Sequence, residues 1–376
     1  MPDHLQIQGG ILLCAAYPAG LATARRNFLE HAAALGIDQF IEAIDGDNGH
    51  GVRFRLRAAL QHEWAPGFDT LELSDKCHFH PLTDARDLER EILLAMLLGP
   101  VTFEYPSYAE LVAALHIRQY IIQAGRHTEL SFHVSQAERP GDFWTYSEEG
   151  GFTLLPGKPL IEALRMATQP EVSGQRYSFS CYRATEYVIL LGIAQELAVC
   201  NPELLQQLQR QWELHAIKSG GFHETFLREY GSMQEPLPPK YYVPGDRLWF
   251  RNPDERSSDV TGYEGSWVIY LGGGWFTNLW DKSRAYNLTA KCVEIYHWRD
   301  GVRTDAEGSL YMDETLVAEQ VRATLQNPER LASIQERMMH LRDPKNVYAD
   351  GGCIDTSREY PRWVCPGTSD INLPQR

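Results

Sequence analysis

A helical spacing of apolar residues begins directly after a short extended run near the middle of the chain. Between residues 182 and 200 the apolar positions recur at intervals of three and four, which predicts a helix with one apolar face. Asn201-Pro202 ends this pattern. The extended run at 177–179 places Cys181 in the first turn of the helix. Unpaired backbone N–H groups and the helix dipole favour a thiolate there, whereas a buried packing cysteine is the alternative interpretation.

Three later segments read as strands joined by tight turns. Residues 243–253 form a turn, an aromatic strand and a second turn, and residues 265–271 form the next strand. The three glycines at 272–274 supply a turn with positive φ, after which residues 275–280 return as a third strand. A helix followed by an antiparallel sheet, with a cysteine at the helix N-terminus, is the layout of papain-like and NlpC/P60-like thiol enzymes.

The pattern divides the chain into three parts and predicts the α+β fold class. Residues 1–95 read as an N-terminal α/β segment with an insertion, and residues 96–300 read as the central domain with the antiparallel sheet. Residues 301–376 read as a helical C-terminal extension and tail, with helices expected over 317–325 and 329–341.

Charge and hydrophobic content exclude several classes of protein. With 35 Lys and Arg against 50 Asp and Glu, the net charge of −15 argues against nucleic acid or an anionic membrane as a partner. No apolar run approaches the roughly 20 residues of a membrane span. The short apolar N-terminal run lacks the basic stretch of a secretory signal. Seven cysteines, widely scattered and odd in number, indicate reduced thiols, so we expect a soluble cytoplasmic protein.

A short cluster of cysteine and histidine residues could in principle bind zinc. Cys77, His78 and His80 lie close together, but no second Cys/His pair follows at the spacing of a zinc site. Pro81 indicates an exposed turn instead. We therefore expect no metal and no cofactor.

Four blocks of sequence, in order, resemble one family of enzymes. The blocks are PVTFEY at 100–105 with AEL at 109–111, YSFSC at 177–181, GDRLWFRNP at 245–253 and VIYLG at 268–272. Together they resemble the spore-coat type of bacterial protein-glutamine gamma-glutamyltransferase, a calcium-independent transglutaminase. The resemblance covers about residues 90–300, implies the NlpC/P60-like fold for that span, and assigns the nucleophile to Cys181.

The resemblance implies thiol-dependent acyl transfer on a glutamine-type amide. In that family the thiolate attacks the carboxamide of a peptide glutamine, ammonia leaves, and a lysine amine converts the thioester into an isopeptide bond. This reaction needs a thiolate, a general acid/base and donors for the oxyanion. The expected partners are a protein or peptide glutamine donor and an amine acceptor.

The chain departs from the family pattern at three positions that carry acid/base groups. The family has a glutamate at the position of Ser180, a second glutamate at the position of Ser266, and a histidine where the best register gives Asn278. The nucleophile therefore remains without its usual partners.

Other residues are candidates to fill these roles. Glu264 precedes Ser266 by two residues, and residues two apart on a strand face the same side, so its carboxylate is one candidate; a solvated charge is the alternative. Asn278 can donate a hydrogen bond to an oxyanion but cannot shuttle a proton. Ser266 and Trp275 are candidate substrate-binding residues. The histidines that could instead supply the acid/base are His215, His223 and His297.

The sequence leaves three functions open. The first is transglutaminase-like acyl transfer through a thioester on Cys181. The second is a glutamine deamidase or amidase, in which water resolves the same thioester. The third is a catalytically silent relative that uses the old cleft for binding.

Overall fold

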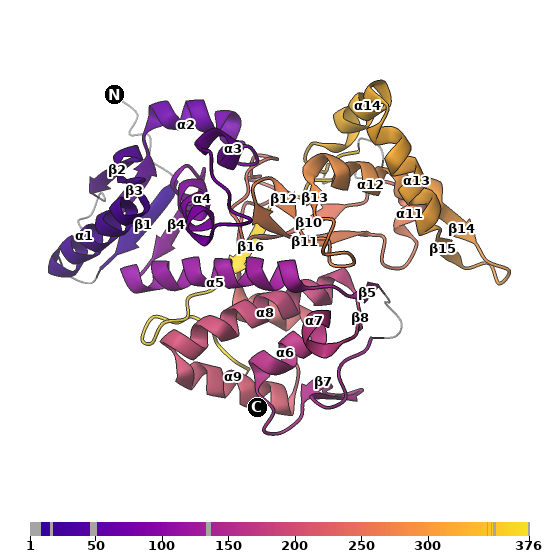
Figure 1. The fold of residues 1–376 in the computed structure, drawn as a ribbon, viewed down its shortest axis with the longest axis horizontal. Helices are drawn as coiled ribbons and strands as arrows, with labels where there is room; N and C mark the ends of the chain where they lie inside the picture. The colour runs from indigo at the N-terminus through magenta and orange to yellow at the C-terminus, as the bar shows by residue number, and fades with distance from the viewer. Residues whose placement is uncertain are drawn as a thin grey trace.

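The computed structural model describes residues 9–15, 18–45, 51–132, 137–343, 345–346, 348 and 351–374. A six-stranded sheet lies at its centre, with a four-stranded sheet on the N-terminal side, a layer of helices beneath and a helical lobe on the C-terminal side (Figure 1). The architecture is mixed α+β, as the sequence predicts.

The central sheet contains the predicted hairpin. β10 (Arg247–Arg251) pairs antiparallel with β11 (Gly265–Gly272), which in turn pairs with β12 (Trp275–Phe276). The glycines at 272–274 all have positive φ, the backbone conformation that side chains rarely adopt, and they form the turn between β11 and β12. The sheet has the order β13-β12-β11-β10-β16-β9 and is completed by β13 (Tyr286–Asn287), β16 (Arg358–Pro361) and β9 (Leu227–Tyr230).

Two long helices, α5 (Tyr108–His127) and α8 (Cys181–Cys200), form the layer beneath this sheet (Figure 1). They approach so closely that a Cβ on Gly192 would lie 2.6 Å from Cγ1 of Ile121, so the contact requires glycine. The same region contains α6 (Leu160–Thr168), α7 (Pro170–Ser173), α9 (Pro202–Leu214), α10 (Ser219–Phe226), β5 (Ser131–Phe132), β6 (Trp144–Ser147), β7 (Gly151–Leu154) and β8 (Ser178–Phe179).

The N-terminal part builds a second sheet in the order β2-β3-β1-β4. β4 (Thr102–Tyr105) pairs parallel with β1 (Gly10–Cys14), so this sheet extends past residue 95, where the sequence analysis divides the chain. The other elements of this part are β2 (Ile41–Asp45), β3 (Gly51–Leu56), α1 (Pro18–Leu35), α2 (Ala58–Trp64), α3 (Leu73–Cys77) and α4 (Ala85–Leu97).

A buried carboxylate joins the N-terminal part to the central sheet. Glu91 of α4 is 1% exposed and accepts hydrogen bonds from the Gly273 backbone N–H at 2.9 and 3.0 Å. The Ser74 and Tyr270 hydroxyls also donate to it, at 2.7 and 3.2 Å. Burial raises the pKa of Glu91 to about 7. A single side chain from α4 therefore holds the glycine turn of β11 and β12.

The C-terminal lobe packs three helices beside the central sheet (Figure 1). α12 (Leu288–Gly301) follows β13, and α13 (Glu314–Leu325) and α14 (Pro328–Met338) lie against it, close to the two C-terminal helices that the sequence predicts. The lobe also includes α11 (Glu255–Ser258) and the antiparallel hairpin of β14 (Val302–Thr304) and β15 (Leu310–Met312).

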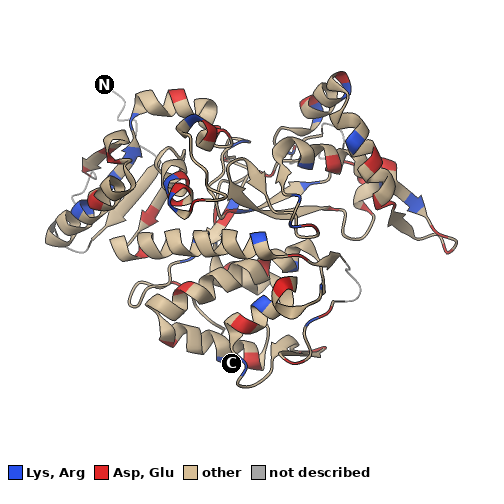
Figure 2. Ribbon diagram, viewed as in Figure 1, with Lys and Arg blue, Asp and Glu red and all other residues tan. Residues whose placement is uncertain are grey.

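Acidic and basic residues occur together in the N-terminal part, in the helical layer and in the C-terminal lobe of the ribbon in Figure 2. Within the described ranges, every helix is too short or too polar to cross a bilayer.

Candidate active site

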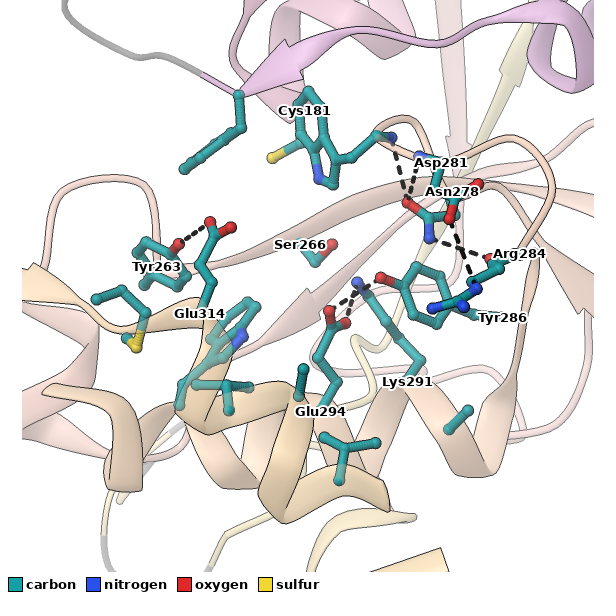
Figure 3. Close-up of a pocket in the computed structure, with 18 of the residues that line it drawn as sticks. Cys181, Tyr263, Ser266, Asn278, Asp281, Arg284, Tyr286, Lys291, Glu294 and Glu314 are labelled. Carbon is teal, nitrogen blue, oxygen red and sulfur yellow. Dashed lines mark hydrogen bonds and ion pairs between the residues drawn. The ribbon is translucent and has the colours of Figure 1, made fainter.

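A cavity of about 840 Å³ lies where the central sheet, the start of α8 and the C-terminal lobe meet (Figure 3). Its size is within the range of about 300–1,000 Å³ that is typical of ligand pockets. Cys181 and Ser266 lie on one side, charged residues of α12 lie on the other, and α13 contributes a largely apolar wall. The α13 residues that line it are Glu314, Val317, Ala318, Val321, Arg322 and Leu325.

Cys181 is the first residue of α8 and faces this cavity. The preceding Ser180 caps the helix, because its hydroxyl oxygen accepts a hydrogen bond from the Arg183 backbone N–H at 3.3 Å. Ser180 therefore stabilises the helix that carries the thiol.

The environment of Cys181 raises the pKa of its thiol. Burial is the largest cause, because it disfavours the charged thiolate. Backbone N–H groups of Trp267 and Tyr182 beside the sulfur act in the opposite direction, as do the positive charges of Lys291 and Arg247. Burial therefore opposes the effect of the helix N-terminus and of the nearby cations on this thiol.

A buried cation lies behind the thiol. Arg247 is 0% exposed, and its guanidinium carbon lies 4.3 Å from the ring centre of Tyr182 and 4.2 Å from that of Trp267. Its Nη1 lies 3.1 Å from Oε2 of Glu359, whose other oxygen is 2.7 Å from Nδ1 of His223. Arg247 thus fixes the two residues whose backbone N–H groups flank the sulfur.

An ion pair and a tyrosine face Cys181 and Ser266 across the cavity (Figure 3). Lys291 of α12 is 4% exposed, and its Nζ donates a hydrogen bond to Oε2 of Glu294 at 2.7 Å. The Tyr286 hydroxyl donates to Oε1 of the same carboxylate at 2.9 Å, and the Lys291 ammonium lies 4.2 Å from the Tyr286 ring centre. Both titratable groups of this pair are therefore held in place at the cavity wall.

Ser266 and Asn278 both line the cavity, but they differ in how their side chains are used. Ser266 is 8% exposed and lies on β11 opposite Phe250. Asn278 instead organises the turn after β12. Its Oδ1 accepts the backbone N–H groups of Trp280 and Asp281 at 3.1 and 3.2 Å, and its Nδ2 donates to the Arg284 carbonyl at 3.0 Å.

The structure does not bring Glu264 or Trp275 into the cavity. Glu264 is exposed, and its carboxylate accepts the Gly262 backbone N–H at 3.3 Å. It precedes the first residue of β11, so the alternation of sides that applies within a strand does not extend to it. Trp275 is 37% exposed on β12 and lies outside the set of residues that line the cavity.

The three candidate histidines also lie outside the cavity lining. His297 is 0% exposed and is held by Asp300 at 2.6 Å and by the Thr324 hydroxyl at 2.8 Å, so it is a packing residue of the C-terminal lobe. His223 pairs with the Glu359 carboxylate, and His215 is the C-cap of α9.

Sequence reasoning missed Lys291, Glu294 and Tyr286. The spacing of three between Lys291 and Glu294 marks an ion pair on one face of a helix. No local pattern says that this face points at a cysteine more than 100 residues earlier in the chain. Within the described residues, no group of three or more His, Cys, Asp or Glu side chains is placed to hold a metal ion.

Comparison with known proteins adds independent information. The family model described as protein-glutamine gamma-glutamyltransferase matches residues 72–344, which is more than half of the chain. A protein-glutamine gamma-glutamyltransferase of Bacillus licheniformis is 27% identical over 170 residues, or 44% of this chain. The match spans 63% of that relative's length. A solved transglutaminase from Geobacillus stearothermophilus, without its C-terminal extension, is 18% identical and has a TM-score of 0.39 over 58% of this chain and 98% of its own.

Proposed function

The chain belongs to the protein-glutamine gamma-glutamyltransferase family, and from that premise we propose that it transfers the acyl group of a peptide glutamine through a thioester on Cys181. The observation that carries the proposal is the placement of Cys181. Its sulfur faces a cavity of about 840 Å³, with the backbone N–H groups of Trp267 and Tyr182 beside it. Those N–H groups are the proposed donors to the oxyanion that forms when the thiolate attacks.

The proposed reaction has two covalent steps. The Cys181 sulfur bonds to the carboxamide carbon of glutamine, the C–N bond breaks, and the nitrogen leaves as ammonia after gaining a proton. A primary amine then attacks the thioester carbon, loses a proton, and displaces the sulfur, which leaves an isopeptide bond and regenerates the thiolate. Each step requires a group that gives or takes one proton near the sulfur.

We assign that proton transfer to Lys291, held by Glu294, in place of the family residues that Ser180, Ser266 and Asn278 replace. Lys291 gives a proton to the departing ammonia and recovers one from the incoming amine, so it ends each cycle as it began. Its positive charge also lowers the pKa of Cys181, which favours the attacking thiolate. Glu294 and Tyr286 fix the ammonium through the 2.7 Å ion pair and the contact with the ring.

Two alternatives share the same cavity. If water rather than an amine resolves the thioester, the chain is a glutamine deamidase or amidase. If the loss of the family acid/base residues at 180, 266 and 278 has ended catalysis, the cavity serves binding alone. The first alternative keeps Cys181 essential, whereas the second does not.

Ammonia release from a glutamine peptide separates these functions. The reduced protein is compared with Cys181→Ala, and with Cys77→Ala as the matched cysteine control, in the presence and absence of a primary amine. Acyl transfer predicts ammonia release by the parent and by Cys77→Ala, with the amine incorporated into the peptide. Ammonia release without incorporation would indicate the deamidase. Release no greater than that of Cys181→Ala, restored by Ser266→Glu with Asn278→His, would refute the proposal in favour of a silent relative.

A further inference from the structure

The fold brings together thiols that lie far apart in the sequence. Cys292 of α12 and Cys353 are both 0% exposed, and their sulfur atoms lie 3.2 Å apart although 61 positions separate them. The Cys353 thiol also contacts the Met338 carbonyl at 3.2 Å, which holds it beside its partner. From the sequence alone, the scattered and odd-numbered cysteines indicate unpaired thiols. The spacing of the cysteines along the chain does not predict the contact between Cys292 and Cys353.

A second pair lies at the other end of the helical layer. Cys200 is the last residue of α8, and the Cys365 thiol lies near enough to lower the pKa of the Cys200 thiol. Cys365 is held in place because its backbone N–H donates to Oε1 of Glu110 at 2.8 Å. Cys365 belongs to an apolar cluster of buried residues and Cys200, which is partly buried, packs against the same cluster.

The two pairs bracket a strand of the central sheet. β16 lies between Cys353 and Cys365 in sequence and pairs with both β9 and β10. Its flanking cysteines meet α12, which carries Lys291 next to Cys292, and α8, which carries Cys181 at its first residue. The segment that returns through the sheet therefore meets a thiol on α8 and a thiol on α12, two of the helices that line the cavity.

We propose that these four cysteines are a site of oxidative modification, in which the disulfides Cys292–Cys353 and Cys200–Cys365 fasten β16 to α12 and α8. A disulfide needs sulfur atoms about 2.05 Å apart, so the Cys292 and Cys353 sulfurs must approach by about 1.2 Å, a small side-chain movement. Each bond forms by exchange with a small-molecule disulfide such as oxidised glutathione. The two thiols lose two electrons and two protons, and the small disulfide becomes two free thiols.

The nucleophile is separate from both pairs. Cys181 and Cys200 lie at opposite ends of α8, roughly 28 Å apart at 1.5 Å per residue. Cys14 contacts a carboxylate of Glu104 rather than a thiol. Oxidation of the two pairs would therefore consume four of the seven cysteines and leave Cys14, Cys77 and Cys181 as thiols.

Oxidative refolding tests the proposal while giving the buried thiols access to the oxidant. The full chain is refolded from denaturant in oxidised and reduced glutathione, quenched with N-ethylmaleimide, digested and mapped by mass spectrometry. The expected products are a peptide of Cys292 linked to one of Cys353 and a peptide of Cys200 linked to one of Cys365. Full alkylation of all four cysteines in excess oxidised glutathione, or linkage to other partners, would overturn the proposal.

Thermal unfolding of the refolded protein gives a second readout. The Cys292–Cys353 bond would close a loop of about 60 residues, which should raise Tm by roughly 5 °C relative to the reduced protein. Cys353→Ser should lose that part of the shift, whereas Cys77→Ser, the matched control, should keep it. An equal shift in Cys353→Ser would contradict a bond at this pair, and the peptide map of the parent protein decides the case if the variant does not fold.

Discussion

Glu91 couples the N-terminal part to the hairpin of the central sheet, and its replacement by glutamine tests how a buried titratable group sets stability. Glu91 is 1% exposed, and its carboxylate accepts hydrogen bonds from the Gly273 backbone N–H and from the Ser74 and Tyr270 hydroxyls. Glutamine keeps the shape and an oxygen acceptor for the Gly273 N–H. The hydroxyl beside the new NH₂ group, that of Ser74 or that of Tyr270 according to the orientation of the amide, can reverse its role and accept from it.

The magnitude follows from the two pKa values of this carboxyl group. Burial raises the pKa of Glu91 from 4.5 to about 7 in the folded protein. Between these values the folded state keeps a proton that the unfolded state releases, so the free energy of unfolding falls as the pH rises. At about 1.4 kcal/mol per pH unit, this group contributes about 3 kcal/mol that is present below pH 4.5 and lost as the pH rises through about 7.

Urea unfolding at pH 4.5, 6, 7 and 8 measures this contribution. We expect Glu91→Gln to gain about 3 kcal/mol relative to the parent protein between the lowest and highest pH, because the variant has no proton to release. Glu264→Gln, which replaces an exposed glutamate just before β11, is the matched control and should follow the parent at every pH. Burial also raises the pKa of Glu186 to about 7. Glu186 is present in all three proteins, so its contribution to the pH dependence of unfolding cancels in the comparison. A constant difference between Glu91→Gln and the parent across this range would refute the account of Glu91.

Three further predictions concern the cavity. Lys291→Met should lower turnover roughly a hundredfold and shift the pH profile of Cys181 alkylation to higher pH, because it removes the cation that favours the thiolate. Glu264→Gln is the control and should leave both kcat and the alkylation profile unchanged. The same unchanged values in Lys291→Met would exclude Lys291 from the chemistry. In the reduced protein, iodoacetamide at pH 7 should label Cys200 before Cys181, because the Cys365 thiol lowers the pKa of Cys200 while burial raises the pKa of Cys181. If mass spectrometry shows that Cys181 is labelled first, burial does not control the reactivity of its thiol. Asn278→Ala should lower the free energy of unfolding by about 2 kcal/mol through its lost turn hydrogen bonds, and Asn278→Asp, which keeps an acceptor for the Trp280 and Asp281 N–H groups, should lower it less. A urea midpoint of Asn278→Ala equal to that of the parent protein would show that the turn does not depend on this side chain.

Local pattern was sufficient for the elements that frame the cavity. The helical spacing before Asn201-Pro202 predicts α8 nearly to the residue, and the glycines at 272–274 predict the turn of the β11–β12 hairpin. Both depend on interactions between residues close in sequence, so the sequence alone carries the information.

The composition of the cavity depends on distant contacts that no local pattern specifies. Glu264 lies one residue before the start of β11, so the alternation of sides within the strand, on which the prediction that it faces the same side as Ser266 relied, does not extend to it. Lys291 reaches the cavity only because α12 packs beside the central sheet with that face turned inward. The Cys292–Cys353 contact likewise requires the final segment to return through the sheet as β16.

Trapping a covalent intermediate on Cys181 tests the central claim most directly. The reduced protein is mixed with a glutamine peptide in the absence of amine, quenched in acid within seconds, and analysed as the intact chain and by peptide mapping. The proposed mechanism predicts an adduct equal to the peptide less one ammonia, located on Cys181, absent from Cys181→Ala and discharged on addition of a primary amine. An adduct on another residue, or none in a protein that releases ammonia from the same peptide, would contradict acyl transfer through Cys181.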